Sequence, residues 1–325
     1  MANQQQHILL SLTKQFKHTE LIVMNLKELI KNNIPFKSIK EIMPWWLKVG
    51  SKIVIYRLPI GDKFWKSIGF FQHDQMEVPE YAYQAFQQHF QRVSQSKYLK
   101  PGFTSLELGP GNSLFSALIC RSLGGEKTYM VDVDNFAIEN PKFYQEMASY
   151  LKQQNLPIIN IESSQSFSEI MKNCGGVYLT SGLGSLKEIE DHSVDFIWSH
   201  AVLEHIRRDE FLKIMQETRR VISDDGVCSH TVDLKDHLDG SLNNLRFQAN
   251  FWESNFVNNS GIYTNRIRCV EMLDIFKEAG FEVRATELEK WPNLPIPRTS
   301  LAKQFQNFSD DELCISGFSI LLIPV

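Results

Sequence analysis

The residues of this chain that are best suited to bind a ligand follow three short apolar runs. Glu107, Gly109 and Gly111 form the pattern E-x-G-x-G after the first run, and Asp132 follows the second run, 21 positions after Gly111. The third run belongs to SVDFIWSHAVLEHI (193–206), which adds acidic and imidazole groups. Glycines in such a turn let a ligand approach the backbone, and the later acid can accept hydrogen bonds from both hydroxyls of a ribose. The spacing predicts a ligand that contains a nucleoside.

The glycine turn also indicates which nucleoside ligand is favoured. A dinucleotide-binding turn has a third glycine three positions after the second, where this chain has Leu114. Glu107 would repel a pyrophosphate, because both groups are negatively charged. The same carboxylate suits a cationic ligand with an amino acid portion. The pattern therefore favours such a ligand over NAD, which stays as an alternative.

The elements that must position these residues alternate along the chain from about residue 101. Helical patterns such as 211–222 and 269–280 separate most of the apolar runs. Alternation of this kind predicts an α/β fold with a mainly parallel sheet, whose last two strands form an antiparallel pair at one edge. Seven strands are predicted, at 104–109, 128–133, 176–180, 194–199, 227–234, 281–288 and 315–324.

The first hundred residues have a different pattern and predict a helical N-terminal cap. Apolar positions within 20–30 have the spacing of an amphipathic helix, and 78–93 predicts a helix that leads into the next domain. The segment 43–60 mixes Trp and Lys, which suits a membrane surface, a protein partner or the protein's own interior. We expect residues 1–100 to cover the cofactor side of a domain at 101–325, with 66–83 near the site.

Composition excludes several classes of protein. The 325 residues carry a net charge of -4, which argues against a nucleic-acid partner. The five cysteines are scattered without a C-x-x-C pair, which predicts reduced thiols with no zinc site and no disulfide framework. We expect no other metal site, because the sequence suggests no cluster of ligands. The first 15 residues lack the features of a signal peptide, and no apolar run reaches 18 residues. A cytoplasmic protein is the resulting expectation.

The three motifs together resemble the class I S-adenosylmethionine-dependent methyltransferases. ELGPG is similar to the first motif of that superfamily, VDVD to its ribose-binding second strand, and RRVISDDG (219–226) to the turn before its fifth strand. The resemblance covers about 101–325 and implies a Rossmann-like class I methyltransferase fold, a seven-stranded sheet with an antiparallel last strand. The segment after the fourth strand matches the superfamily pattern D-x-I-x-S-x-x-V-L-E-H-I at Asp195, Ile197, Ser199, Val202, Leu203, Glu204, His205 and Ile206.

The resemblance implies roles for individual residues around S-adenosyl-L-methionine. Glu107 is expected near the amino end of the cofactor, Asp132 on the ribose and Val133 on the adenine. The superfamily usually has an acid after the third strand for the adenine amine, but this chain has Gly182 and Leu183 there, so the backbone would take that contact. The remaining cofactor-binding residues expected along these turns are Gly109, Gly111, Asn112, Ser113 and Ser199.

The acceptor is less clearly indicated. The chain has SHAV where enzymes that methylate amines of bases or glutamine amides carry a D/N-P-P-Y/F run, and no cysteine nucleophile stands there. A small-molecule, sugar-like or lipid-linked acceptor, methylated at oxygen, is therefore the main hypothesis. A non-catalytic S-adenosylmethionine-binding protein is a further alternative.

The long segment 233–268 is expected to bind the acceptor. His237, Asp233 and His200 follow the fifth and fourth strands and are the candidate bases, each of which could equally be structural. His205 lies in the shared motif, where a structural role is indicated at least as strongly as a catalytic role. Two cations of the same segment, Arg266 and Arg268, suit either an anionic substrate or a carboxylate of the fold.

Overall fold

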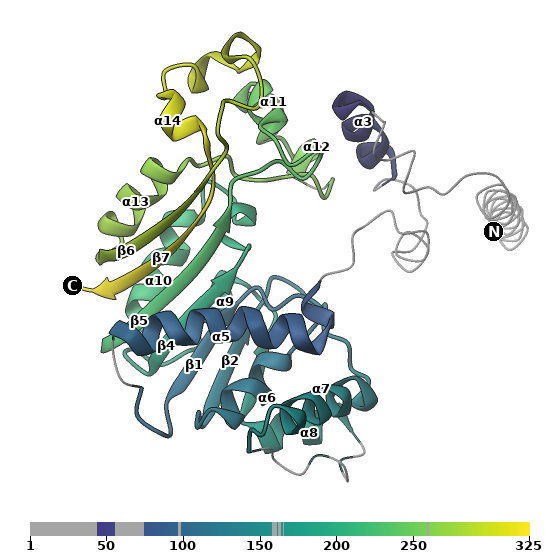
Figure 1. Cartoon of the computed structure of the whole chain (residues 1–325), viewed down its shortest axis with the longest axis vertical. Coiled ribbons are helices and arrows are strands. Elements are labelled where there is room, and N and C mark those ends of the chain that lie inside the picture. The colour runs from purple at the N-terminus through teal and green to yellow at the C-terminus, as the bar shows by residue number, and fades with distance from the viewer. Residues whose placement is uncertain are drawn as a thin grey trace, which may run out of the picture. The chain divides into compact units, whose positions relative to one another are not determined.

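A computed structural model describes residues 44–55, 75–96, 99–157, 161, 164, 166–258 and 260–325 (Figure 1). The chain divides into two compact units, Met1–His73 and Asp74–Val325. The first contributes helix α3 (Trp45–Ile55), and the predicted helix at 20–30 lies outside the described residues. No helix in these described ranges is long and apolar enough to cross a membrane.

The second unit is built around one seven-stranded sheet in the order β3-β2-β1-β4-β5-β7-β6. All pairs from β3 to β5 are parallel, while β7 is antiparallel to both of its neighbours. All seven predicted strands and the antiparallel final pair are confirmed. The strands are β1 (Thr104–Leu108), β2 (Lys127–Val131), β3 (Gly176–Leu179), β4 (Val194–His200), β5 (Ile222–Asp233), β6 (Phe281–Lys290) and β7 (Ile315–Pro324).

Helices cover both faces of the sheet, because side chains of a strand point alternately to its two faces. Phe196 and Trp198 of β4 pack with one set of helices, and Ile197 between them packs with the other. The first set is α5 (Pro79–Ser96), α6 (Phe115–Ser122), α7 (Pro141–Gln153) and α8 (Phe167–Cys174). The second set is α9 (Leu183–Lys187), α10 (Phe211–Val221) and α13 (Cys269–Glu278).

Helix α5 belongs to the same compact unit as the sheet, although we placed its residues in the N-terminal cap. Its apolar stripe, including Phe86 and Val93, is buried in the core, and the Phe86 and Trp198 rings meet edge to face at 5.3 Å. Figure 1 shows α5 lying across the strands. The unit therefore begins at Asp74, ahead of the predicted boundary at 100/101. A cap formed by the earlier residues stays a prediction.

Two segments form a small third core beyond the sheet. One is part of the predicted acceptor segment, and the other is the 291–314 connection between β6 and β7. Leu245 of the first packs with Leu301 and Phe305 of the second. Their helices are η3 (Asn243–Arg246), α11 (Ala249–Trp252), α12 (Asn255–Asn258), η4 (Arg298–Ser300), η5 (Lys303–Phe305) and α14 (Asp310–Leu313).

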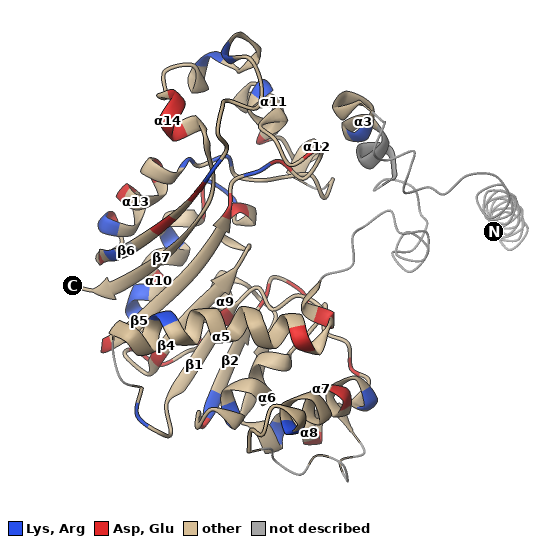
Figure 2. Cartoon of the chain, viewed as in Figure 1, with Lys and Arg blue, Asp and Glu red and all other residues tan. Residues whose placement is uncertain are grey.

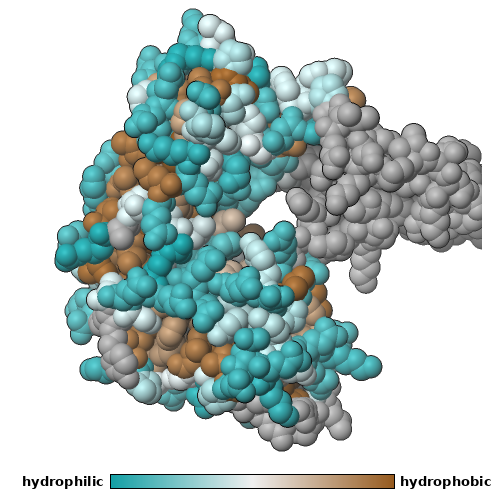
Figure 3. Space-filling view, viewed as in Figure 1, coloured by the Kyte–Doolittle hydropathy of each residue, from teal (hydrophilic) through white to brown (hydrophobic). Residues whose placement is uncertain are grey.

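The surface of the described part is mixed in charge and mostly hydrophilic. Basic and acidic residues alternate over the ribbon in Figure 2, as the net charge of -4 leads one to expect. On the face seen in Figure 3, hydrophilic residues dominate and the apolar ones form small patches. This pattern agrees with apolar burial between the helices and the sheet.

Candidate functional site

The glycine turn after β1 packs tightly against the turn after β4. Gly109 has a φ of +66°, and a Cβ atom there would lie 2.6 Å from Val202 Cγ1. The Gly109 amide donates to the carbonyl of Val131, the last residue of β2, at 2.8 Å. Only glycine fits this backbone without displacing Val202. The three loops predicted to form the site therefore meet at the carboxyl ends of β1, β2 and β4.

Asp132 directs its carboxylate into the glycine turn. One oxygen accepts from the Gly111 amide at 3.0 Å and the other from the Val133 amide at 2.7 Å. Burial raises the pKa of Asp132, while these two amides act in the opposite direction. The carboxylate thus lies at the rim where β2 ends, as the ribose role requires.

Val133 and the turn after β3 form an apolar edge beside Asp132. Val133, two residues after the end of β2, is 73% exposed, which is a large exposure for a valine. The Gly182 amide donates to the Asp132 carbonyl at 2.8 Å, and a Cβ atom on Gly182 would lie 3.3 Å from Val133 Cγ1. Leu183 is the first residue of α9. An exposed valine backed by a close turn suits a flat apolar ring such as adenine.

The remaining residues of the glycine turn differ in their accessibility. Glu107 is buried and accepts from the Ser116 hydroxyl at 2.5 Å, which places it under the start of α6. Asn112 donates its side-chain amide to Glu77 at 2.7 Å. Ser113 is buried and its hydroxyl accepts from the Phe115 amide at 3.4 Å, so this side chain faces the interior.

Ser199 and His200 point to opposite faces of the sheet because they are consecutive in β4. The Ser199 hydroxyl is fully buried, 2.8 Å from His230 Nδ1 on the face covered by α13. Its side chain is therefore occupied inside the core, and the structure does not place it at the predicted cofactor rim. Burial lowers the pKa of His230 to about 3.

His200 lies on the face covered by α5, within a group of polar side chains. Its Nε2 is 3.4 Å from the Tyr81 hydroxyl, and its Nδ1 is 3.4 Å from His89 Nε2. His89 in turn lies 2.8 Å from the Ser229 hydroxyl. Burial and then the charge of Arg92 lower the pKa of His200, so this imidazole is neutral at pH 7. A neutral imidazole can accept a proton.

The VLEHI turn forms a second group of polar side chains on η2 (Leu203–His205). Glu204 is buried, and neither of its carboxylate oxygens has a hydrogen-bond partner among the described residues. Burial raises the pKa of Glu204 to about 8. The rings of His205 and His237 are 4.8 Å apart. We predicted no cluster of metal ligands, yet the ligand atoms of these three side chains lie within 4.8 Å of one another.

The other candidates from segment 233–268 are engaged in the fold. Asp233 accepts from Lys235 Nζ at 3.1 Å and from the Lys235 amide at 2.8 Å. Arg266 pairs with Glu253 at 3.1 Å. Arg268 is 1% exposed and donates to backbone carbonyls, among them Ile315 at 2.6 Å. Arg266 therefore meets a carboxylate of the fold, one of the two options from the sequence, whereas Arg268 holds backbone carbonyls, which neither option included.

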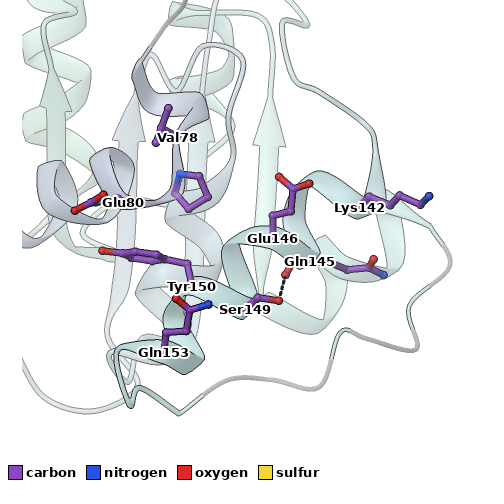
Figure 4. A pocket seen from close by; sticks show the side chains of 9 residues that line it. Val78, Glu80, Lys142, Gln145, Glu146, Ser149, Tyr150 and Gln153 are labelled. Carbon is purple, nitrogen blue, oxygen red and sulfur yellow. Dashed lines mark hydrogen bonds between the residues drawn. The ribbon is translucent and has the colours of Figure 1, made fainter.

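A groove between the start of α5 and helix α7 is separate from these groups (Figure 4). Side chains of both charges line it, including Glu80, Lys142 and Glu146, and Ser149 donates to the Gln145 carbonyl at its edge. None of the candidate site residues is among those that line it.

Comparison with known proteins agrees with this geometry. A family model described as a methyltransferase domain matches residues 144–229, from α7 through most of β5. This match supports the resemblance to the class I S-adenosylmethionine-dependent methyltransferases that the sequence motifs indicated. The ribosomal protein L11 methyltransferase of Dictyoglomus turgidum is 28% identical over 150 residues, which is 46% of this chain and 39% of that protein. The matched part of this chain therefore spans about two fifths of the length of that relative.

Solved structures with a similar chain course include two methyltransferases. One, from Methanosarcina mazei, is 14% identical with a TM-score of 0.43, and the similarity covers 70% of this chain and 95% of that one. The other is a phosphoethanolamine N-methyltransferase of Haemonchus contortus, 14% identical with a TM-score of 0.41, covering 74% and 52%. At these values the similarities do not bear on the acceptor.

The residues around the rim fit S-adenosylmethionine, the methyl donor of this family. Asp132 would hold the ribose hydroxyls through its carboxylate, and the exposed Val133 side chain would pack on the adenine. Gly109 has no side chain and lies directly against Val202, which keeps the turns after β1 and β4 together beside these two residues. A ligand with a sugar, a flat ring and an extended amino acid portion could contact Asp132, Val133 and the glycine turn in that order.

Proposed function

We propose that this protein transfers the methyl group of S-adenosylmethionine to a hydroxyl oxygen of a small-molecule, sugar-like or lipid-linked acceptor. The observation that carries the proposal is His200, a neutral imidazole at the carboxyl end of β4. Val202, two residues later, touches the glycine turn that would hold the cofactor. When bound, the cofactor supplies an activated methyl group.

In this proposal His200 takes the acceptor's proton. A neutral imidazole accepts a proton from a hydroxyl readily near pH 7, and such help contributes about 10²–10⁴-fold to a rate. His89 orients the ring at Nδ1, and the acceptor hydroxyl would replace the Tyr81 hydroxyl at Nε2, which takes the proton. Segment 233–268, braced by its own core with 291–314, would shape the acceptor pocket.

A protein acceptor is the second candidate. The relative from Dictyoglomus turgidum is named for methylation of a ribosomal protein, and the similarity covers 46% of this chain. The electrostatics of the described surface, with charges of both signs interspersed, favour neither candidate.

Isotopic methyl transfer into a cell extract separates these candidates. We expect label in the small-molecule or lipid fraction, with mass spectrometry placing the methyl group on oxygen. His200→Gln should lower the rate by about 10²-fold or more while S-adenosylhomocysteine binds as before. Tyr81→Phe, which keeps the ring but removes the hydroxyl, is the matched variant and should have a smaller effect. Label confined to protein would favour the second candidate, and an unaffected His200→Gln rate would exclude His200 as the base.

A further inference from the structure

We propose that Glu204, His205 and His237 bind a divalent transition-metal ion at the carboxyl ends of β4 and β5. The three side chains come from two turns that lie 32 positions apart in the sequence. One carboxylate and two imidazoles form a ligand set typical of zinc and related ions, and three protein ligands leave at least one coordination position open.

The distances allow an ion to be bound with small side-chain movements. The three ligand atoms lie within 4.8 Å of one another. Ligand atoms around tetrahedral zinc are about 3.4 Å apart, as bond lengths of about 2.1 Å require. The side chains therefore need to close by about 1.4 Å at most. Both histidines are exposed while Glu204 is buried, so an ion can enter from solvent and meet the carboxylate last.

The burial of the Glu204 carboxylate without a hydrogen-bond partner in the described part of the chain is the strongest evidence for a bound ion. The residue is only 2% exposed, and neither oxygen has a hydrogen-bond partner among the described residues. Buried carboxylates without a partner are costly, and natural proteins normally pair them or use them to coordinate a metal. A divalent cation between the carboxylate and the imidazoles would remove this cost.

The surrounding turn holds the cluster in position. The Tyr263 carbonyl, which can only accept, lies 3.2 Å from His205 Nδ1, so Nδ1 carries the proton and Nε2 has the lone pair. Hydrogen bonding of the second ring nitrogen to a carbonyl is the usual arrangement for a metal-binding histidine. Asn265 is buried and donates to the Leu203 and Ile206 carbonyls at 2.8 and 2.9 Å, which fixes η2.

The open position of the ion would take an oxygen atom of the acceptor, a step that rests on the proposed function. Val202 of the same turn lies against Gly109, so the cluster is adjacent to the glycine turn. A metal ion lowers the pKa of an oxygen ligand, and the released proton passes to water or to a base. Hydroxyl groups that can bind a metal are the acceptor class that this arrangement favours.

The test is a titration of the full chain, first treated with a chelator, with Zn²⁺ by calorimetry and with Co²⁺ by absorption spectroscopy. We expect one ion per chain and Co²⁺ bands in the visible range. His237→Ala and Glu204→Gln should each weaken binding by more than about tenfold. His192→Ala, which changes an exposed histidine outside the cluster, is the matched control and should bind as the native chain does.

Parallel titration with S-adenosylhomocysteine distinguishes this inference from the proposed function. Cofactor binding without metal binding, or an equal loss of metal affinity in His192→Ala, would overturn the metal site alone. Metal binding without cofactor binding would overturn the proposed function and leave the site standing. Acetohydroxamate, a small bidentate oxygen ligand, should shift the Co²⁺ bands, and unchanged bands would refute the open position.

Discussion

Gly109→Ala should destabilise the protein through two separable effects. The φ of +66° costs an alanine about 1–2 kcal/mol. The added methyl group would also lie 2.6 Å from Val202 Cγ1 and 2.7 Å from Cγ2, and overpacking of this kind costs about 1–3 kcal/mol. We expect the free energy of unfolding to fall by about 2–5 kcal/mol in total.

Gly240→Ala separates the two contributions. Gly240 has a φ of +64°, almost the same as Gly109, but nothing lies within 4 Å of a Cβ atom there. Its alanine variant should therefore lose only the conformational part, about 1–2 kcal/mol. Urea unfolding followed by the fluorescence of tryptophans such as the buried Trp198 measures both values.

A double-mutant cycle with Val202→Ala completes the test, because shortening Val202 removes the atoms that the new methyl group would meet. The coupling energy should equal most of the steric cost of Gly109→Ala, while the conformational cost should stay the same with either residue at position 202. Equal losses in Gly109→Ala and Gly240→Ala, or no coupling with Val202, would refute the tight packing of the two turns. Affinity for S-adenosylhomocysteine should fall with Gly109→Ala and recover in the double variant.

Three further predictions concern other residues. Asp132→Ala should weaken S-adenosylhomocysteine binding in calorimetry by about 1–3 kcal/mol, while Asp134→Ala, in the exposed loop beyond it, should have little effect. The folded pKa of His230, about 3, is below its ordinary value of 6.5, so the unfolded state binds the extra proton and stability is lost as pH falls below 6.5. In urea unfolding, His230→Leu should reduce the dependence of the unfolding free energy on pH by about 1.4 kcal/mol per pH unit between about pH 4.5 and 6 and leave it unchanged above about pH 7, and the same dependence in both proteins would contradict the prediction. Arg268→Met should cost about 3 kcal/mol or more, because it leaves buried carbonyls without a donor, whereas Arg284→Met on the exposed edge should stay within about 0.5 kcal/mol.

The sheet was predictable because each strand is a short apolar run between turn residues. Phe196, Ile197 and Trp198 are all buried, as in a strand covered on both faces, and this property is visible in the sequence. The positions of Gly109 and Asp132 were predictable for a related reason, since both directly follow such runs, while their contacts with the cofactor stay a prediction.

The parts that could not be predicted depend on tertiary contacts. The proximity of Glu204 and His237 brings residues more than 30 positions apart together through the fold, and no local spacing indicates it. The core between Leu245 and Phe305 likewise joins distant segments. The orientation of Ser199, in contrast, could be predicted, because consecutive residues of a strand such as Ser199 and His200 face opposite sides of the sheet.

The position of β7 in the sheet has a consequence for synthesis of the protein on the ribosome. Strand β5 ends at Asp233, but its outer partner β7 ends only at Pro324. At about 5–20 residues per second, translation of the 91 intervening residues takes roughly 5–20 s. During that time the outer edge of β5 has no strand beside it, and such an edge can pair with another nascent chain. Once β7 is in place, the outermost strand is β6, whose charged residues Glu282, Arg284, Glu287, Glu289 and Lys290 discourage that pairing.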